Sequence, residues 1–70
     1  MEIELINYME LNDFGRVLRK WRTEAGITLS VLAQESHVSA NTIARIERQE
    51  IEPKCKTAGA IWKALIKLTN

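Results

Sequence analysis

The chain is poor in residues that form covalent or metal links. Among 70 residues it has one cysteine, Cys55, and one histidine, His37. A single cysteine cannot form an internal disulfide, and a histidine without partners at ligand spacing does not make a zinc site. We therefore expect no metal and no cofactor. The stability of the fold must therefore come from its hydrophobic core, with contacts to a partner subunit as a second contribution.

Long apolar runs and catalytic signatures are also missing. No segment approaches the ~20 apolar residues that a membrane-spanning helix needs, and the acidic N-terminus lacks the basic start of a secretory signal. There is no glycine-rich phosphate loop, no Cys/His nucleophile pair in a recognisable motif and no predictable carboxylate pair. We therefore expect a cytoplasmic protein that has no membrane partner and is not an enzyme.

Apolar residues at helical spacing are abundant, and they predict a compact all-α fold of about four helices. One helix is expected to begin after Asn12 or Asp13 and to end at Gly26, a C-cap glycine. Its buried stripe comprises Phe14, Val17, Leu18, Trp21 and Ala25. Pro53 ends an irregular link, and a last helix is expected over residues 55–68.

Residues 28–47 predict two short helices joined by a tight turn. Leu32 and Ala33 can pack inward only if the chain reverses near His37, and histidine tolerates the positive φ of such a turn better than most residues. Ser39 then serves as the N-cap of the second helix, because its hydroxyl can accept a backbone N–H two or three residues further on.

The second of these helices has one buried side and one open side. The helical period buries Ile43 and Ile46 and leaves a short polar side that comprises Ala40, Asn41, Ala44, Arg45 and Arg48. The alanines allow close approach to a groove floor, while Asn41 and Arg45 can reach adenine and guanine edges. This pattern indicates a DNA-reading helix; the alternative is an ordinary solvated helix face.

Charge is distributed unevenly although the net charge is only +1. Residues 1–13 hold four acids and no base, whereas residues 14–70 hold all ten Lys and Arg against five acids, a net charge of +5. Phosphate binding requires such a surplus. Four of the cations lie in the first helix, and we assign about half of them to a solvated face: Arg16, Arg19, Lys20 and Arg22.

The run from Phe14 to Pro53 also contains the motifs of a known family, in order and at matching spacing. The motifs are Leu18–Arg22, Ala25–Thr28, Leu32-Ala33, Val38-Ser39, Thr42-Ile43 and Ile46–Arg48. On these motifs the chain resembles the Cro/phage-repressor (Xre-type, lambda-repressor-like) helix-turn-helix family over more than half of its length. Two positions depart from the pattern. Leu29 replaces a frequent glutamine, which removes a phosphate contact, and Val31 replaces the glutamate of a capping box.

The resemblance implies a recognition helix over Ser39–Glu47 that lies in the major groove. The DNA-binding residues that it implies are Ser39, with Ala40, Asn41, Thr42 and Arg45 nearest the bases, and Arg48, Gln49 and Lys54 along the phosphates. It also implies an ion pair between Arg22 and Glu47 that locks the recognition helix to the first helix. The alternative is two unrelated surface charges.

The last helix has more apolar surface than one core contact requires. Beside an inward stripe that runs from Ala58 to Leu68, Trp62 and Ile66 form a second stripe, which suggests a dimer or partner surface. Domains of the resembled family usually add a fifth helix here. The alternative is that both stripes pack into the core of one protomer.

Residues 1–12 lie outside the resemblance and form an N-terminal extension of a helix-turn-helix domain at residues 13–70. Their partial alternation of apolar residues slightly favours a β-strand that pairs with its symmetry mate over an extra helix, and an acidic disordered arm is the third option.

These features predict a sequence-specific regulator of transcription, a repressor that binds double-stranded DNA as a homodimer. Two recognition helices about 34 Å apart would read an inverted-repeat operator, and the protein would be nucleoid-associated. The alternative is an antitoxin-like or other interaction module that binds a protein partner through Trp62 and Ile66 or through the N-terminal arm.

Overall fold

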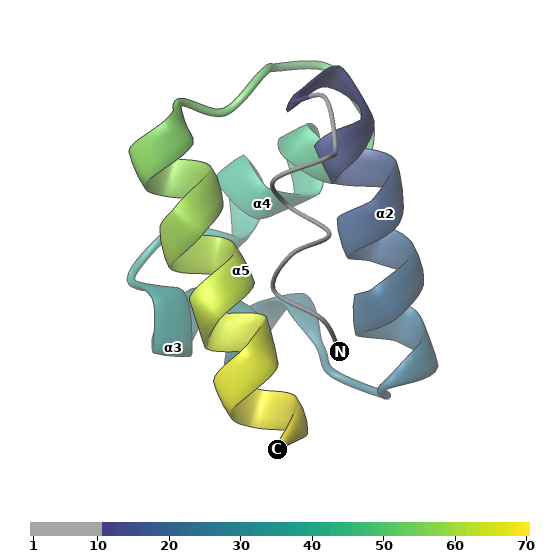
Figure 1. Ribbon diagram of the computed structural model, residues 1–70, viewed down its shortest axis with the longest axis vertical. Helices are drawn as coiled ribbons and strands as arrows, with labels where there is room; N and C mark the ends of the chain where they lie inside the picture. The colour runs from purple at the N-terminus through teal and green to yellow at the C-terminus, as the bar shows by residue number, and fades with distance from the viewer. Residues whose placement is uncertain (1–10) are drawn as a thin grey trace.

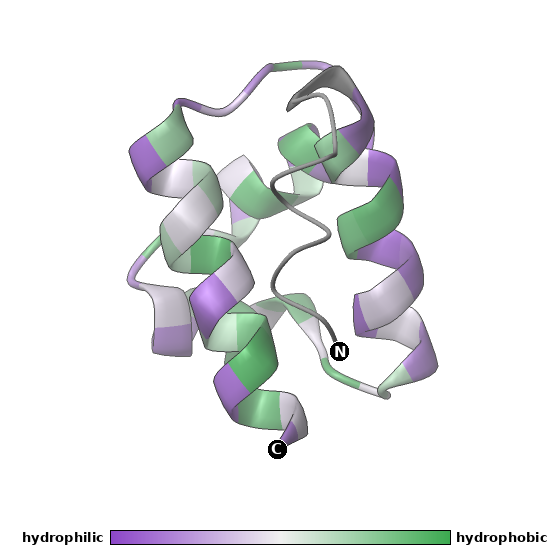
Figure 2. Ribbon diagram, viewed as in Figure 1, coloured by the Kyte–Doolittle hydropathy of each residue, from purple (hydrophilic) through white to green (hydrophobic). Residues whose placement is uncertain are grey.

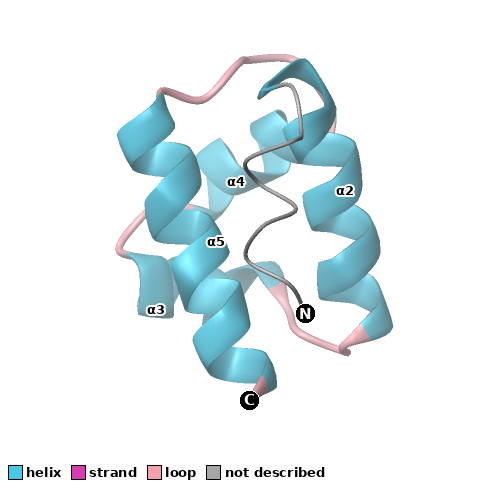
Figure 3. Cartoon of the chain, in the orientation of Figure 1, coloured by secondary structure: helices cyan, strands magenta, loops and turns pink. Residues whose placement is uncertain are grey.

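The computed structural model describes residues 11–70, with side chains from Asp13 onward. This part of the chain forms four α-helices: α2 (Leu11–Glu24), α3 (Leu29–Ser36), α4 (Ala40–Glu47) and α5 (Cys55–Thr69). Figures 1 and 3 show that they are joined by loops without any strand in the described residues. The predicted all-α fold is therefore confirmed, and α2 begins slightly earlier than expected. The strand, helix or arm considered for the N-terminal extension concerns residues that lie mostly outside those described.

The helices enclose one core. α2 packs against α4 and α5, and α3 packs against α4 and α5. In Figure 1, α2 and α5 stand on either side of the view and α4 crosses behind them. Hydrophobic and hydrophilic segments alternate along α2 and α5 in Figure 2, as expected for helices with one face in a core. The buried apolar residues are Phe14, Leu18, Leu32, Ile43, Ile46, Ala58, Ile61, Trp62, Ala64 and Leu65.

The burial of Trp62 corrects one expectation. Its side chain is only 1% exposed, and its ring lies 6.0 Å from the ring of Phe14, centroid to centroid. Ile66 is half-buried and packs against the same core. Because α5 packs against both α2 and α3, it buries a wide face rather than one stripe. The expectation of an exposed surface made by Trp62 and Ile66 was therefore wrong.

The turns before and after α3 follow the predicted chemistry. Thr28 caps α3, its Oγ1 accepting the Val31 N–H at 3.1 Å, although no glutamate completes a capping box. His37 ends α3 with φ 61°, and Gly26 has φ 72° in the preceding turn. Both residues adopt the left-handed conformation that the sequence indicated. No helix in the described residues is long and apolar enough to cross a membrane.

Candidate nucleic-acid interface

The start of α4 is fixed by two side chains. Ser39 Oγ accepts the Thr42 N–H at 3.1 Å and donates its own hydrogen to Thr42 Oγ1 at 2.7 Å. Ser39 therefore caps the helix as predicted. Because both hydroxyls take part in this cap, their positions at the open end of α4 are set before any ligand arrives.

The outer face of α4 has the composition that the sequence indicated. Ile43 and Ile46 point into the core, whereas Asn41, Arg45 and Arg48 are exposed. The smaller residues between them, Ala40, Thr42 and Ala44, are half-buried. The exposed side is therefore polar and cationic. The short side chains of its alanines would let the helix approach base edges closely.

An ion pair anchors α4 to α2. Arg22 donates from Nε to Glu47 Oε2 at 2.6 Å and from Nη2 to Glu47 Oε1 at 2.9 Å, and its Nη1 donates to the Ile27 carbonyl at 2.8 Å. The two side chains are only 12% and 4% exposed. The predicted pair is thus present, bidentate and largely buried, so its geometry restricts how α4 can sit on α2.

A close backbone approach reinforces this anchor. Gly15, buried in α2, faces the end of α4, where an added Cβ would lie 1.9 Å from the Ile46 carbonyl oxygen. Only glycine leaves room for this approach. Sequence reasoning missed Gly15, although a glycine inside a helical pattern is a signal for close packing because it lowers helix stability by about 1 kcal/mol relative to alanine.

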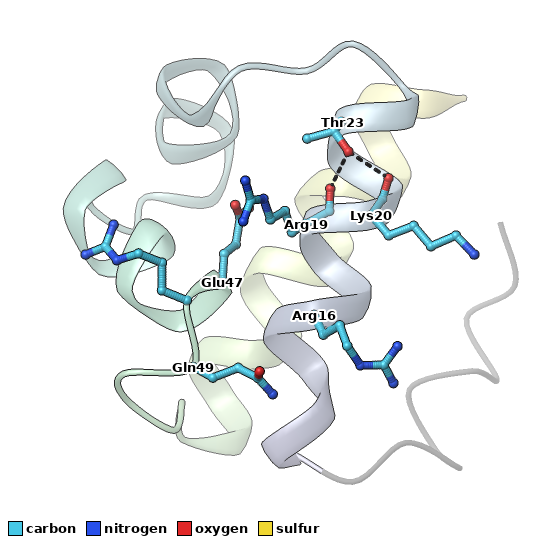
Figure 4. Close-up of a pocket in the computed structure, with 7 residues that line it drawn as sticks. Arg16, Arg19, Lys20, Thr23, Glu47 and Gln49 are labelled. Carbon is cyan, nitrogen blue, oxygen red and sulfur yellow. Dashed lines mark hydrogen bonds between the residues drawn. The ribbon is translucent and has the colours of Figure 1, made fainter.

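A basic groove lies between α2 and the end of α4 (Figure 4). Its lining residues are Arg16, Arg19, Lys20, Thr23, Glu47, Arg48 and Gln49. Four of them are cationic, and the one carboxylate is already bonded to Arg22. The groove therefore has an excess of positive charge next to the open face of α4. Arg16, Arg19 and Lys20 were not among the predicted site residues, because the sequence alone could not tell which cations of α2 lie beside α4 and which lie on a solvated face.

The turn after α4 brings an unforeseen carboxylate to the same face. Gln49 has φ 61° and its N–H donates to the Ile46 carbonyl, while the Glu50 N–H donates to the Arg45 carbonyl at 2.9 Å. This backbone pattern is a Schellman cap with a residue other than glycine in the left-handed position. It places the Glu50 carboxylate beside Arg45 and Arg48, with which it forms ion pairs.

These contacts change the titration of the groups involved. The hydrogen bond from Arg48, helped by the positive charges of Arg48 and Arg45, lowers the pKa of Glu50 below its usual value. The same hydrogen bond raises the pKa of Arg48. Both groups are therefore charged throughout the neutral range. Lys54, the remaining predicted phosphate ligand, is exposed at the N-cap of α5 and does not line the basic groove.

Two short helices joined by a left-handed turn, with the second one open to solvent and flanked by cations, define a helix-turn-helix DNA-binding domain. A family model described as a helix-turn-helix domain matches residues 13–65, and the chain belongs to this Xre/Cro-like family. Membership implies DNA binding and a role in the regulation of transcription, and the family is typically non-enzymatic. Comparisons with curated proteins and with solved structures gave no match.

Proposed function

We propose that this protein regulates transcription by binding a specific DNA sequence with α4 in the major groove. One observation carries the proposal: the exposed face of α4, with Asn41 and Arg45 at its centre, belongs to a helix whose other face is anchored by the Arg22–Glu47 pair. A reading helix must be held rigidly, because hydrogen bonds to base edges depend on the position and angle of the donor.

Each residue of the face has a role that fits its chemistry. Asn41 offers an amide for two hydrogen bonds to adenine, and Arg45 offers a planar guanidinium for two hydrogen bonds to guanine. Ala40 lies at the first turn, where a small side chain allows close approach. Ser39 and Thr42, whose hydroxyls bond each other, contact DNA from the capped end of the helix.

The phosphates on either side of the groove would be bound by the cations that flank α4. Arg48 and Gln49 line the basic groove together with Arg16, Arg19 and Lys20, so one DNA strand would run along it. Lys54 would bind a phosphate outside this groove. Each neutralised phosphate releases condensed cations, which makes the affinity depend steeply on salt concentration.

The protein would act as a homodimer on an inverted repeat and would repress the promoter that it covers. One short helix reads only a few base pairs, so two copies related by a two-fold axis, with reading helices about 34 Å apart, lengthen the site that is read. Because Trp62 belongs to the core, the contact between the copies would involve other residues. This role places the protein in the cytoplasm, with the chromosome.

Selection of bound sequences from a random duplex pool tests the proposal. The expected result is an enriched inverted repeat that is still preferred over scrambled DNA when the salt concentration is raised. Sedimentation of the complex should give two protein chains per duplex. Binding without any enrichment, lost as salt rises, would contradict sequence-specific recognition.

The alternative function, an antitoxin-like or other protein-interaction module, is not favoured by the described residues. It depended on Trp62 and Ile66 as an exposed contact surface, and Trp62 is buried against Phe14. Among the residues with described side chains, Val31 is the one large hydrophobic residue that is exposed, at 43%. The other contact considered, the N-terminal arm, lies outside the described residues.

A further inference from the structure

The Glu50 carboxylate contacts two arginines at the end of α4 and uses a different oxygen for each. Its Oε2 accepts a hydrogen bond from Arg48 Nε, and its Oε1 lies 3.6 Å from Arg45 Nε. The Glu50 N–H also donates to the Arg45 carbonyl at 2.9 Å. The backbone bond and the Arg48 bond together keep Oε1 beside Arg45, so this carboxylate is held more firmly than a surface acid with a single partner.

The contact with Arg45 leaves the outer edge of the guanidinium open. The ion pair joins Glu50 to Nε, the nitrogen next to the side-chain stem. Among the residues that the structure describes, no other hydrogen bond or ion pair involves the Arg45 side chain. Nη1 and Nη2 can therefore donate two parallel hydrogen bonds to O6 and N7 of a guanine. Arg45 can do this while its Nε stays beside Glu50.

An arginine that reads a base must be held in one orientation. The Arg45 side chain is 46% exposed, and a long exposed side chain loses rotamer freedom when it binds. A contact that restricts the side chain before DNA arrives reduces this loss. The reduction favours binding only where a guanine lies in front of the Nη edge, because no other base pair offers the same two acceptors there.

We propose that Glu50 is a positioning residue for base recognition, which holds Arg45 by its Nε and directs the Nη edge at a guanine. This inference rests on the proposed function. The ion pair is kept in the complex, so Glu50 increases the preference for guanine at the position that Arg45 reads. Its negative charge, in contrast, weakens binding to every duplex alike, because all duplexes of equal length carry the same phosphates.

A double-mutant cycle tests the proposal, with wild type, Glu50→Gln, Arg45→Ala and the double variant as its members. Each protein is titrated with the duplex selected by the wild type and with duplexes that replace the one base pair whose preference depends on Arg45. The measured quantity is the preference, defined as the ratio of the two affinities. The effect of net charge cancels in this ratio. Circular dichroism and the unfolding midpoint of each variant establish that the fold is intact.

Glu52→Gln is the matched control, because it removes the same charge two residues away. Glu52 is exposed and takes part in no ion pair within the described part of the chain. We expect Glu50→Gln to lower the preference about three- to fivefold, which is within the range that one exposed ion pair contributes. In the Arg45→Ala background the same substitution should leave the preference unchanged. Glu52→Gln should leave it unchanged in both backgrounds.

Three results would overturn the inference while the proposed function stands. An unchanged preference in Glu50→Gln would mean that Glu50 contributes only net charge. A raised preference would mean that Glu50 competes with the base for Arg45. An equal fall of the preference with and without Arg45 would mean that Glu50 acts through another residue. If the wild type enriches no sequence at all, the proposed function fails, and the inference fails with it.

Discussion

A Cβ atom placed on Gly15 would lie 1.9 Å from the carbonyl oxygen of Ile46, so α2 and the end of α4 touch through backbone atoms. This contact and the Arg22–Glu47 pair join the same two helices. The position of the proposed reading helix is therefore set by α2, an element that is distant in sequence.

Gly15→Ala should destabilise the fold despite the better helix propensity of alanine. The methyl group must push the Ile46 carbonyl away, and overpacking of this kind costs about 1–3 kcal/mol or more. Gly59→Ala is the control, because nothing lies within 4 Å of its Cβ position in α5. It should raise stability by about 1 kcal/mol. Urea unfolding measures both, and a stabilised Gly15→Ala protein would refute the close contact.

Arg22→Leu should be strongly destabilising, because it leaves the Glu47 carboxylate buried without its partner. Removal of one member of a buried pair typically costs about 3–5 kcal/mol. The control is Arg16→Leu, since Arg16 forms an exposed pair with Asp13 at 3.9 Å. The loss of such a pair changes stability by about 0–1 kcal/mol. Similar unfolding free energies for the two variants would contradict the anchoring role of Arg22.

His37→Gly should stabilise the turn between α3 and α4. His37 is exposed with φ 61°, a conformation that costs a residue with a Cβ about 1–2 kcal/mol, while glycine loses part of this gain through its greater freedom when unfolded. A net gain of about 0.5–1 kcal/mol is expected. His37→Val should lower stability, because β-branched residues avoid positive φ. The idea fails if the valine variant is the more stable of the two.

The pKa of Glu50 should rise toward its ordinary value of 4.5 when Arg48 is replaced by glutamine, because Arg48 supplies the main interaction that lowers it. With the folded pKa below the unfolded one, the interaction stabilises the fold above the unfolded pKa and is lost as pH falls through the folded pKa. A carboxyl-carbon titration by nuclear magnetic resonance follows this directly. Identical Glu50 titrations in wild type and variant would exclude the contact in solution.

Arg45→Ala and Arg19→Ala should affect DNA binding in different ways. The loss of Arg45 should cost about 1–3 kcal/mol on the selected duplex and relax the preference at one base pair. The loss of Arg19, which lines the basic groove, should weaken binding to selected and scrambled DNA equally and reduce the salt slope by about 1. Competition binding with duplexes substituted at each position separates these outcomes. An equal loss for Arg45→Ala on both duplexes would limit Arg45 to phosphate binding.

Sequence reasoning was most successful where a local rule decides the structure. The cap at Ser39, the left-handed turn at His37 and the burial of Phe14 and Leu18 in α2 each follow from residues that are close in the chain. Ala25, the last residue of the predicted stripe, is exposed instead, because α2 ends at Glu24. The Arg22–Glu47 pair spans the domain and came instead from the family resemblance. Trp62 was misjudged because a stripe on one helix does not tell how many neighbours cover that helix.

The basic groove and the Glu50 contact could not be predicted for a different reason. The groove depends on which cations of α2 lie beside α4. Gly15 and the expected Arg22–Glu47 pair mark the side of α2 that faces α4, but they do not tell which neighbouring cations line a groove there. The Glu50 contact depends on a left-handed Gln49, where a cap of this type usually has glycine. No pattern of residue types in the turn indicates this conformation.

The two sides of α4 have separate tasks, and this separation bears on how the protein can evolve. Ile43, Ile46 and Glu47 fix the helix in the domain, whereas Asn41 and Arg45 are exposed. Substitutions on the exposed side leave the core packing untouched, and such surface changes usually alter stability by about 0.5 kcal/mol or less. If α4 reads DNA as proposed, a lineage could therefore exchange one DNA target for another through a few codon changes at positions 41 and 45 while the scaffold stays constant.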